Sequence, residues 1–250
     1  MVCTVKLYEK PILNNPVLIE GLPGIGFVAN IASLHLIREL NAKFFGEIHS
    51  STFQDFAIST EEGKPRIPIN ELYYYNGKDA ERDLIILYGN TQALTTFGQY
   101  ELCGKILDLA EQLGCHQIIT LGGLRKDGKI DSSKLYCAAT DHESLQEALN
   151  FDAQIISGQI FGLAGLLIGL GKLRGFKGVS FLAETLGLYP DTVAAQKALD
   201  AVCKMLNLNV DFSRLDKAAQ ITRNVLEVFG LLEKTAEEGK DEESEFRWSV

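Results

Sequence analysis

The sequence of 250 residues offers little of what disulfide-bonded or metal-binding proteins need. Its five cysteines are scattered, no two of them have C-x-x-C spacing, and the four histidines are scattered as well. Secreted disulfide frameworks usually pair an even number of cysteines, and structural zinc sites cluster their cysteine and histidine ligands. We therefore expect reduced, buried thiols in a cytoplasmic protein, with no metal and no other cofactor.

Basic charge and long apolar runs are also scarce. The chain carries 33 acidic residues against 24 lysines and arginines, a net charge of −9. A chain without a basic surface is a poor partner for nucleic acid or for an anionic membrane. The N-terminus lacks the basic and apolar regions of a signal peptide, and the most apolar stretch, Ile160–Leu170, is too short to cross a bilayer. We expect this stretch to be a buried core helix.

The acidic charge is concentrated near the C-terminus. Seven acids and two lysines between Glu233 and Glu245 give −5, which leaves only −4 for the remaining chain. Apolar residues at helical spacing end near Leu232, and polar, charged residues follow. We expect a single α/β domain over residues 1–236 and a disordered acidic tail over residues 237–250.

Several segments indicate strands of a sheet. Leu84–Tyr88, Ile118–Leu121 and Val179–Ala183 are continuous apolar runs, which are typical of parallel strands buried on both faces. Val17–Glu20 and Phe44–Ile48 indicate two further strands. The stretch over residues 51–82 mixes short strands with turn signals and reads as a β-rich insertion.

Helical patterns lie between or after these runs. We predict helices over Phe27–Leu40 and Thr96–Leu113, a third that starts at Pro190, and a last one capped by Ser213. Strands that alternate with helices indicate an α/β fold with a mostly parallel sheet covered on both faces.

Glycines in the Ile160–Leu170 helix form a further pattern. Gly162, Gly165 and Gly169 share one helical face, although each glycine costs about 1 kcal/mol relative to alanine. This spacing predicts close backbone packing, either in the core against the sheet or against a neighbouring subunit.

A glycine-rich turn is the strongest candidate for a ligand site. The segment from Gly24 to Ala29 matches G-x-G-x-x-A, the dinucleotide-binding pattern, and a helix N-terminus favours phosphate. A glycine pair and an acid that follow two other strands would lie at the same edge of the sheet. The candidate ligand residues are Gly21, Gly24, Gly26, Gly122, Gly123 and Glu184. The alternative is that the glycines form tight turns that pack helix on strand, and that the acid is solvated or capping.

The rest of the sequence contains no familiar catalytic motif. No lysine follows the glycines as in a P-loop, and no G-x-S-x-G elbow is present. The only tryptophan, Trp248, stands third from the end, after the acidic segment. The last residues, Trp248, Ser249 and Val250, therefore suggest a tethered peptide that docks in a partner's groove. A frayed or loosely docked end is the alternative.

Taken together, five segments in this order resemble the proteasome assembly chaperone 2 family, in its archaeal branch. They are Glu20–Phe27, Phe97–Glu101, Ile118–Gly123, Gly158–Leu167 and Leu182–Asp191. The resemblance covers about Val17 to Leu232. It implies a three-layer α/β/α sandwich similar to purine nucleoside phosphorylases, self-association into homo-oligomers, and binding of proteasome α subunits during ring assembly.

The resemblance also bears on the C-terminus. Proteasome-binding tails in this context end in a hydrophobic residue, tyrosine and any residue. Trp248 and Val250 match this pattern, whereas Ser249 stands where the tyrosine would be. We expect a non-catalytic chaperone that binds α subunits or assembly intermediates. The alternatives are a nucleoside- or nucleotide-binding enzyme that uses the Gly21–Gly26 loop, and an oligomeric scaffold with another partner.

Overall fold

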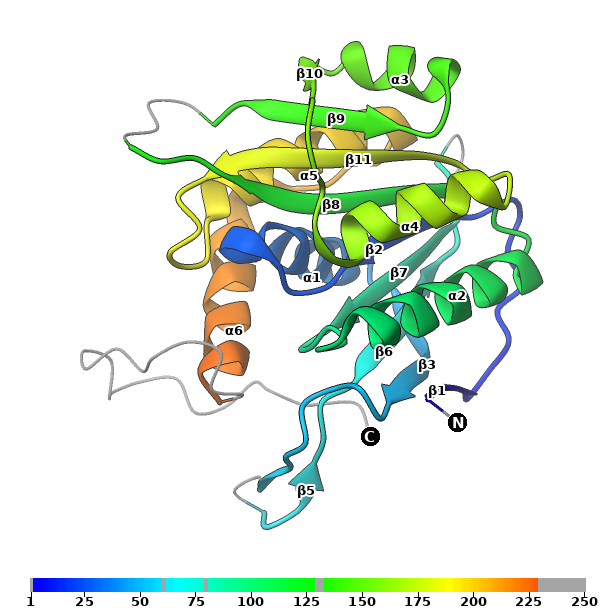
Figure 1. The fold of residues 1–250 in the computed structure, drawn as a ribbon, viewed down its shortest axis with the longest axis vertical. Coiled ribbons are helices and arrows are strands. Elements are labelled where there is room, and N and C mark those ends of the chain that lie inside the picture. Colours follow the sequence, from blue (N-terminus) through cyan, green and yellow to red (C-terminus); the bar gives the residue numbers. More distant parts are fainter. Residues whose placement is uncertain (1, 60–61, 79–80, 129–132, 229–250) are drawn as a thin grey trace.

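The computed structural model describes residues 2–59, 62–78, 81–128 and 133–228. A mixed sheet of nine strands forms the centre of this part of the chain. The strands are β1 (Cys3–Leu7), β2 (Val17–Gly21), β3 (Lys43–Ser50), β6 (Asn70–Tyr75), β7 (Leu84–Gly89), β8 (Gln117–Arg125), β9 (Leu135–Ala139), β10 (Ala153–Ile155) and β11 (Lys177–Thr185). Two short strands, β4 (Ile58–Ser59) and β5 (Pro65–Arg66), form a separate hairpin in an arm that projects from the body in Figure 1.

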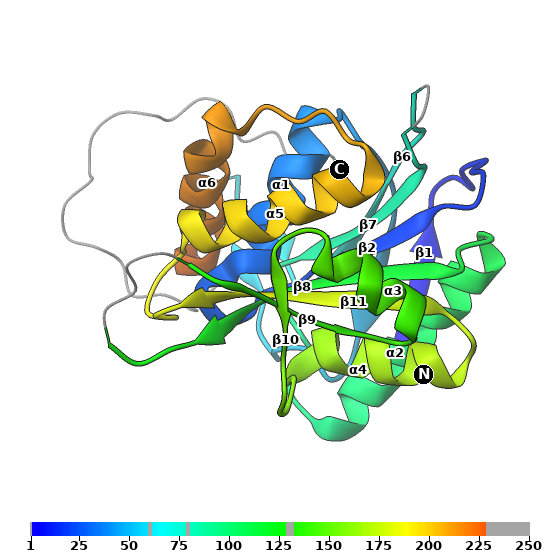
Figure 2. The same ribbon diagram turned by 90° about the horizontal axis from the view of Figure 1, so that it is seen from above.

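Helices cover both faces of the sheet. They are α1 (Val28–Glu39), α2 (Thr96–Gln112), α3 (His142–Leu149), α4 (Gly162–Leu173), α5 (Thr192–Leu206) and α6 (Leu215–Val228), with 3-10 turns η1 (Ile25–Phe27) and η2 (Phe212–Arg214). Figure 2 shows α1, α5 and α6 on one face and α2 and α4 on the other. The predicted helix–sheet–helix layers are thereby confirmed, while the likeness to purine nucleoside phosphorylases stays a prediction.

The strand order is β1-β3-β6-β7-β2-β8-β11-β9-β10. The four central strands, β7, β2, β8 and β11, run parallel. The prediction of a parallel sheet is correct for this centre, but β1, β3, β6 and β7 pair antiparallel, as do β11 and β9. The reason is local: the chain between β3 and β6 forms the arm and returns beside its own strand without the helical crossover that parallel pairing requires.

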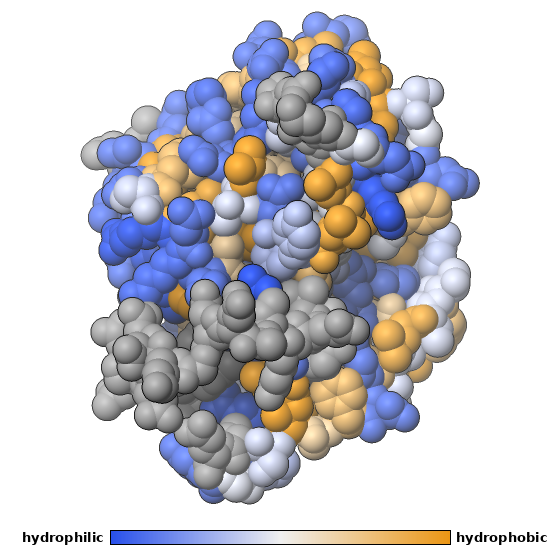
Figure 3. Space-filling model, turned by 90° about the vertical axis from the view of Figure 1, so that its left-hand side faces the viewer, coloured by the Kyte–Doolittle hydropathy of each residue, from blue (hydrophilic) through white to orange (hydrophobic). Residues whose placement is uncertain are grey.

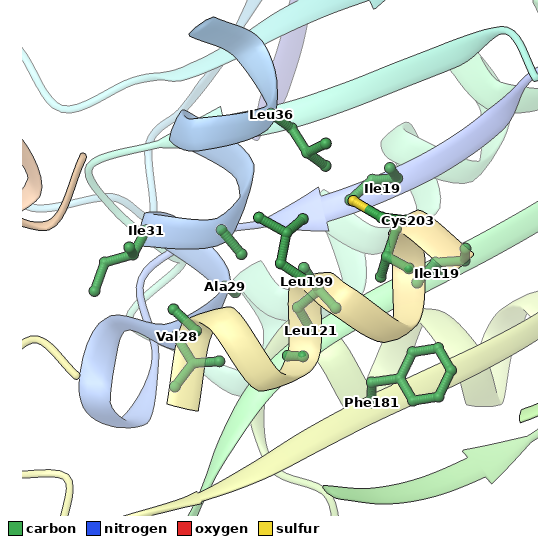
Figure 4. Close-up of a cluster of buried hydrophobic side chains, with 14 of the residues drawn as sticks. Ile19, Val28, Ala29, Ile31, Leu36, Ile119, Leu121, Phe181, Leu199 and Cys203 are labelled. Atoms are coloured by element: carbon green, nitrogen blue, oxygen red, sulfur yellow. The ribbon is translucent and has the colours of Figure 1, made fainter. Parts of the chain in front are cut away.

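Two hydrophobic clusters fill the layers on either side of the sheet. In Figure 4, Ile19, Leu121 and Phe181 from the central strands point toward the α1 and α5 layer. Leu18 and Ile118 point the other way, toward α2 and α4, because successive side chains of a strand alternate between faces. Burial on both faces explains why the central strands read as continuous apolar runs.

Two predicted helix starts need correction. The carboxylate of Asp191 accepts a hydrogen bond from the Ala194 N–H at 2.9 Å and caps α5, so that Pro190 lies just outside the helix. Asp211 caps η2, the turn that leads into α6, through the Ser213 N–H at 2.9 Å. Ser213 is therefore a donor to the cap and not the cap itself. Aspartate serves here because its carboxylate reaches an N–H at the helix start.

Within this chain, only one of the three glycines in α4 packs closely against backbone: a Cβ at Gly165 would lie 2.0 Å from the Ile160 carbonyl oxygen. Packing of these glycines against a neighbouring subunit stays a prediction. A Cβ at Gly169 would meet no atom within 4 Å, and Gly162 has a positive φ of 74° at the start of the helix. Gly171 is the glycine that lies against the core, beside Ile118 and Leu107. Only one side of α4 is buried, because the helix covers the sheet as an outer layer and exposes Leu173 at its end.

Some predictions concern residues outside the described part of the chain. Trp248, Ser249, Val250 and the tail over residues 237–250 lie there, and the domain boundary at residue 236 stays a prediction. The five cysteines are described, and all are buried free thiols, as predicted. Among the described helices, none is both long and apolar enough to cross a membrane.

Candidate functional site

The glycine-rich turn connects β2 to α1 in very little space. A Cβ at Gly21 would lie 2.0 Å from the Ser33 hydroxyl oxygen, so glycine lets α1 approach the strand closely. The Asn30 side-chain amide of α1 donates to the carbonyl oxygens of Gly21 at 3.2 Å and Gly89 at 2.7 Å. This amide thereby joins α1 to the carboxyl ends of both β2 and β7.

The same turn rests directly on the ends of β8 and β11. A Cβ at Gly123 would lie 2.2 Å from the Ile25 carbonyl oxygen, and one at Gly26 would lie 2.7 Å from the Thr185 hydroxyl. The Gly26 carbonyl also accepts a hydrogen bond from the Asp191 N–H at 3.0 Å. The structure thus brings Gly26 and Gly123 together, with protein atoms filling the space where a phosphate would approach. This geometry favours the interpretation as a tight turn.

The remaining candidate glycines differ from these. A Cβ at Gly24 would meet no atom within 4 Å, and one at Gly122 would meet only the Leu182 side chain. Gly24 is extended and open to one side, whereas Gly122 lies within β8. Neither glycine provides a cradle of converging N–H groups in the arrangement seen here.

Glu184 of β11 lies apart from the glycine turn. Its side chain is buried and accepts hydrogen bonds from the Tyr136 hydroxyl at 2.9 Å and the Lys126 ammonium at 3.3 Å. Burial raises the pKa of Glu184, but these two hydrogen bonds outweigh burial, so the pKa lies below its ordinary value. The neighbouring Thr185 contacts Gly26 on the opposite face. The predicted ligand residues are therefore divided between two faces of the sheet.

A second buried acid, Glu20 of β2, was not identified as a candidate from the sequence. One carboxylate oxygen accepts the Leu22 N–H at 2.9 Å, and the other has no partner among the described residues. Burial raises the pKa of Glu20 to about 8, although the Leu22 and Leu121 N–H groups favour the ionised form. The carboxyl group is thus mostly neutral at pH 7. An acid at the end of the apolar run Val17–Glu20 was the available signal.

Exposed apolar side chains gather outside these buried groups, where the four parallel strands end. We call this region the carboxyl-edge surface. It consists of Ile25, Leu94, Phe97, Phe161, Leu188, Tyr189 and Val193, which come from four separate segments of the chain. Figure 3 looks onto this edge and shows apolar side chains at several places among charged ones. Sequence patterns did not indicate this surface, because its residues come from four segments that lie far apart in the chain.

One side chain, Gln92, holds three of the segments in place. Its amide nitrogen donates to the Pro23 carbonyl at 2.6 Å, beside Ile25. Its amide oxygen accepts the Leu163 N–H at 3.2 Å, next to Phe161, and the Gln99 amide at 3.1 Å. The loops after β2 and β7 and the start of α4 are therefore joined through a single amide. Because these segments are already held in place, less conformational entropy would be lost when a partner binds the surface.

The composition of the carboxyl-edge surface fits a protein partner. Phe161 is 76% exposed, and Leu94, Phe97, Leu188 and Val193 are each more than 60% exposed. Aromatic side chains such as Phe97 and Phe161 are enriched in the cores of protein interfaces. An apolar cluster of this kind on a protein surface commonly marks an interaction site.

Comparisons with known proteins support a particular family. The model of the PAC2 family matches residues 18–229. The uncharacterized protein MJ1210 of Methanocaldococcus jannaschii is 31% identical over 221 residues, which cover 88% of this chain and 84% of that protein.

Two crystal structures from Pyrococcus furiosus are also similar. PbaB, described as an archaeal proteasome activator, is 37% identical with a TM-score of 0.82, covering 92% of this chain and 99% of PbaB. PbaA, described as an archaeal homolog of proteasome-assembly chaperone, is 28% identical with a TM-score of 0.74, covering 89% of this chain and 95% of PbaA.

Proposed function

The chain belongs to the PAC2 family, the proteasome assembly chaperone 2 family, and on this basis we propose that it is a non-catalytic, proteasome-related chaperone. Its partners would be proteasome α subunits or their assembly intermediates. The similarity to an archaeal proteasome activator and to an archaeal homolog of proteasome-assembly chaperone supports this role. Self-association and a cytoplasmic location belong to the same proposal.

The carboxyl-edge surface is the observation that carries the proposal. Many α/β enzymes hold a substrate at this edge of the sheet, in a crevice between the strand ends. In this chain the Ile25 carbonyl and Thr185 fill the space beside Gly26 and Gly123, and the exposed groups outside are apolar. A surface of this kind suits a chaperone that covers an apolar assembly face until the proper subunit replaces it, by mass action.

The C-terminal residues form a second part of the proposal. Trp248 would supply an aromatic anchor and the terminal carboxylate of Val250 a charged contact. Ser249 cannot make the contacts of a tyrosine ring. For this reason the carboxyl-edge surface is proposed as the main contact and the tail as a weaker one.

Light scattering with purified proteasome α subunit tests the two contacts separately. The full chain is compared with a chain that ends at Lys234 and with a Phe97→Ser, Phe161→Ser double variant. A Leu173→Ser variant is the matched control, because Leu173 is 82% exposed at the opposite end of α4. We expect the double variant to lose at least tenfold in affinity, and the control to bind like the original chain.

The other outcomes are equally informative. If only the shortened chain loses binding, the tail is the main contact and the carboxyl-edge surface is not. If the full chain does not bind the α subunit at all, the proposed function is wrong.

The enzyme alternative has no comparable support in the structure. A nucleoside or nucleotide would need the space beside Gly26 and Gly123 that protein atoms occupy. A thermal-shift screen with nucleosides, nucleotides and phosphate at millimolar concentration tests it directly. A reproducible increase in Tm would revive that alternative.

A further inference from the structure

A row of buried polar side chains crosses the centre of the sheet. Glu20 of β2 lies opposite Thr120 of β8, and Thr120 lies opposite Ser180 of β11. Glu20 is 1% exposed, and both hydroxyl side chains are fully buried. All three point toward the α2 and α4 layer, because Leu18 and Ile118, two residues earlier in their strands, point there as well. We call Glu20, Thr120 and Ser180 the polar row.

Each member of the polar row has an oxygen without a hydrogen-bond partner among the described residues. These atoms are Glu20 Oε2, Thr120 Oγ1 and Ser180 Oγ. Five buried side-chain atoms in the described part of the chain lack a partner, and three of the five lie in this one row. Folded proteins pair nearly all of their buried polar groups, so three unpaired oxygens side by side need a local explanation.

Helix α2 brings a fourth unpaired oxygen to the same layer. Gln99 uses its amide nitrogen for hydrogen bonds to Gln92 and Ala93, but its buried Oε1 has no partner among the described residues. Burial raises the pKa of Cys103 to about 12, and the charge of Glu20 adds to this, so Cys103 lies near Glu20. Residues four apart share a helical face. Gln99 therefore lies on the side of α2 that faces the polar row.

These oxygens are placed too far apart to satisfy one another directly. Neighbouring strands lie about 4.8 Å apart, whereas an O–H···O hydrogen bond is about 2.8 Å long. A single water molecule between two such groups can reach both, since it can join oxygens up to about twice that distance apart. The row is also built from small side chains: Thr120 and Ser180 are followed on β9 by Ala138, which lies opposite Ser180.

We infer that the polar row binds buried water molecules, which join Glu20, Thr120 and Ser180 to one another and to Gln99 of α2. Water suits these groups because it both donates and accepts, and a buried water commonly makes about three hydrogen bonds to otherwise unpaired groups. The Glu20 carboxyl is mostly neutral at pH 7, so a neutral molecule fits better than a metal ion. No partner protein is needed for this hydration site.

The hydration site would support the carboxyl-edge surface from below. Gln99 lies in the first turn of α2, two residues after Phe97, which belongs to that surface. Gln99 also donates to Gln92, the side chain that holds three of its segments. The water molecules would thus connect the centre of the sheet to the start of α2. This consequence rests on the proposed function, whereas the hydration site itself does not.

A high-resolution crystal structure of the full chain tests the site directly. We expect ordered water within about 3.2 Å of both Glu20 Oε2 and Thr120 Oγ1, and further contacts to Ser180 or Gln99. A row without water overturns the inference. Density for a metal ion overturns it too, and an ion is recognised by oxygen distances of about 2.4 Å.

A valine substitution gives a second test in solution, because the sign of its effect differs between a hydrated and a dry row. Thr120→Val keeps the shape and removes the hydroxyl. If water is bound, it loses a partner, and we expect Tm to fall by roughly 3 °C. If the row is dry, an unpaired group is removed, and Tm stays the same or rises. Either of these two results overturns the inference.

Thr222→Val is the matched control. Thr222 of α6 is fully buried and has an unpaired hydroxyl as well, but Figure 2 shows α6 on the other face of the sheet. We expect this variant to keep or raise its Tm. An equal fall in both variants overturns the inference, because the loss would then not depend on the polar row. If Thr120→Val does not fold, the crystal structure of the original chain decides.

Discussion

The inner and outer parts of the carboxyl edge are built in opposite ways. The inner part, formed by the Gly21–Gly26 turn with Asn30 and Thr185, is closed by the protein's own backbone and side chains. The outer part, the carboxyl-edge surface, exposes apolar side chains to solvent. A location that often holds a small ligand in α/β proteins is thus closed here and lies beneath an exposed apolar surface. Four predictions test this division, from the largest expected effect to the smallest.

Substitution of Gly123 should break the inner part most severely. In Gly123→Ala the new Cβ would lie 2.2 Å from the Ile25 carbonyl oxygen, and a backbone atom cannot move aside cheaply. We expect the free energy of unfolding to fall by more than about 3 kcal/mol, at or above the upper end of the range for overpacked core sites because the clash is with backbone, measured by urea denaturation. Gly24→Ala is the matched control and should change it by less than about 0.5 kcal/mol. Equal effects of the two variants would show that the turn does not rest on β8.

Glu20 should make the stability depend on pH. In the folded state its pKa of about 8 keeps the carboxyl protonated, whereas the unfolded carboxyl loses its proton near the ordinary pKa of 4.5. Between these values the unfolded state binds fewer protons, so stability falls as the pH rises from about 5 to 8.

Replacing Glu20 with glutamine isolates this contribution. We expect Glu20→Gln to remove a decrease on the order of 3 kcal/mol across that pH range, as measured by denaturation at each pH. Glu71 is a partly buried acid whose pKa is also raised, mainly by burial, so the difference in stability between Glu20→Gln and the original chain at each pH is the quantity to compare. Parallel stability curves for variant and original chain would contradict the prediction.

Gln92 connects the inner and outer parts, and its removal should loosen both. Gln92→Ala deletes the hydrogen bonds to Pro23, Leu163 and Gln99 and leaves buried groups unpaired. We expect a loss of about 2 kcal/mol in the free energy of unfolding, with faster hydrogen exchange at the Leu163 amide. Gln112→Ala, at the exposed end of α2, is the control. Unchanged exchange at Leu163 would show that the segments are held by other contacts.

The outer apolar side chains should contribute little to stability. For the Phe97→Ser, Phe161→Ser variant we expect a change in the free energy of unfolding below about 0.5 kcal/mol, because both rings are mostly exposed already. Urea denaturation beside the original chain measures this. A loss of several kcal/mol would mean that these rings belong to the fold and are not reserved for a partner.

The centre of the fold could be predicted because its signals are local. Leu84–Tyr88 and Val179–Ala183 each pair with one parallel and one antiparallel neighbour, and both are buried on both faces of the sheet, so their sequences are mostly apolar. The tight turn at Gly21 was also recognisable, since only glycine permits such a close approach to a helix. Strands away from the centre of the sheet, such as β1 and β9, were not predicted, because they are short, only partly buried and depend on their neighbours for stability.

The candidate site was harder to predict for a different reason. The residues of the carboxyl-edge surface come from four distant segments of the sequence, and only the parallel order of the strands brings Phe97, Phe161 and Leu188 to one edge. The predicted ligand residues failed to come together because strand alternation places Glu184 and Thr185 on opposite faces. Sequence spacing gives the face of a residue within its own element, but not which other elements lie beside it.

The Asn30 amide has a consequence for how the chain assembles during synthesis. Its stronger acceptor, the Gly89 carbonyl, lies 59 residues further along the chain. Both neighbours of β2 in the sheet, β7 and β8, are likewise made later. Strand β2 and helix α1 leave the ribosome early, and β2 takes a place in the middle of the sheet. Yet the buried Asn30 amide, worth about 1–3 kcal/mol when unpaired, lacks its Gly89 acceptor until β7 arrives. Long-range pairing of this kind slows folding, so an early-made part of the chain must wait for partners that are made later.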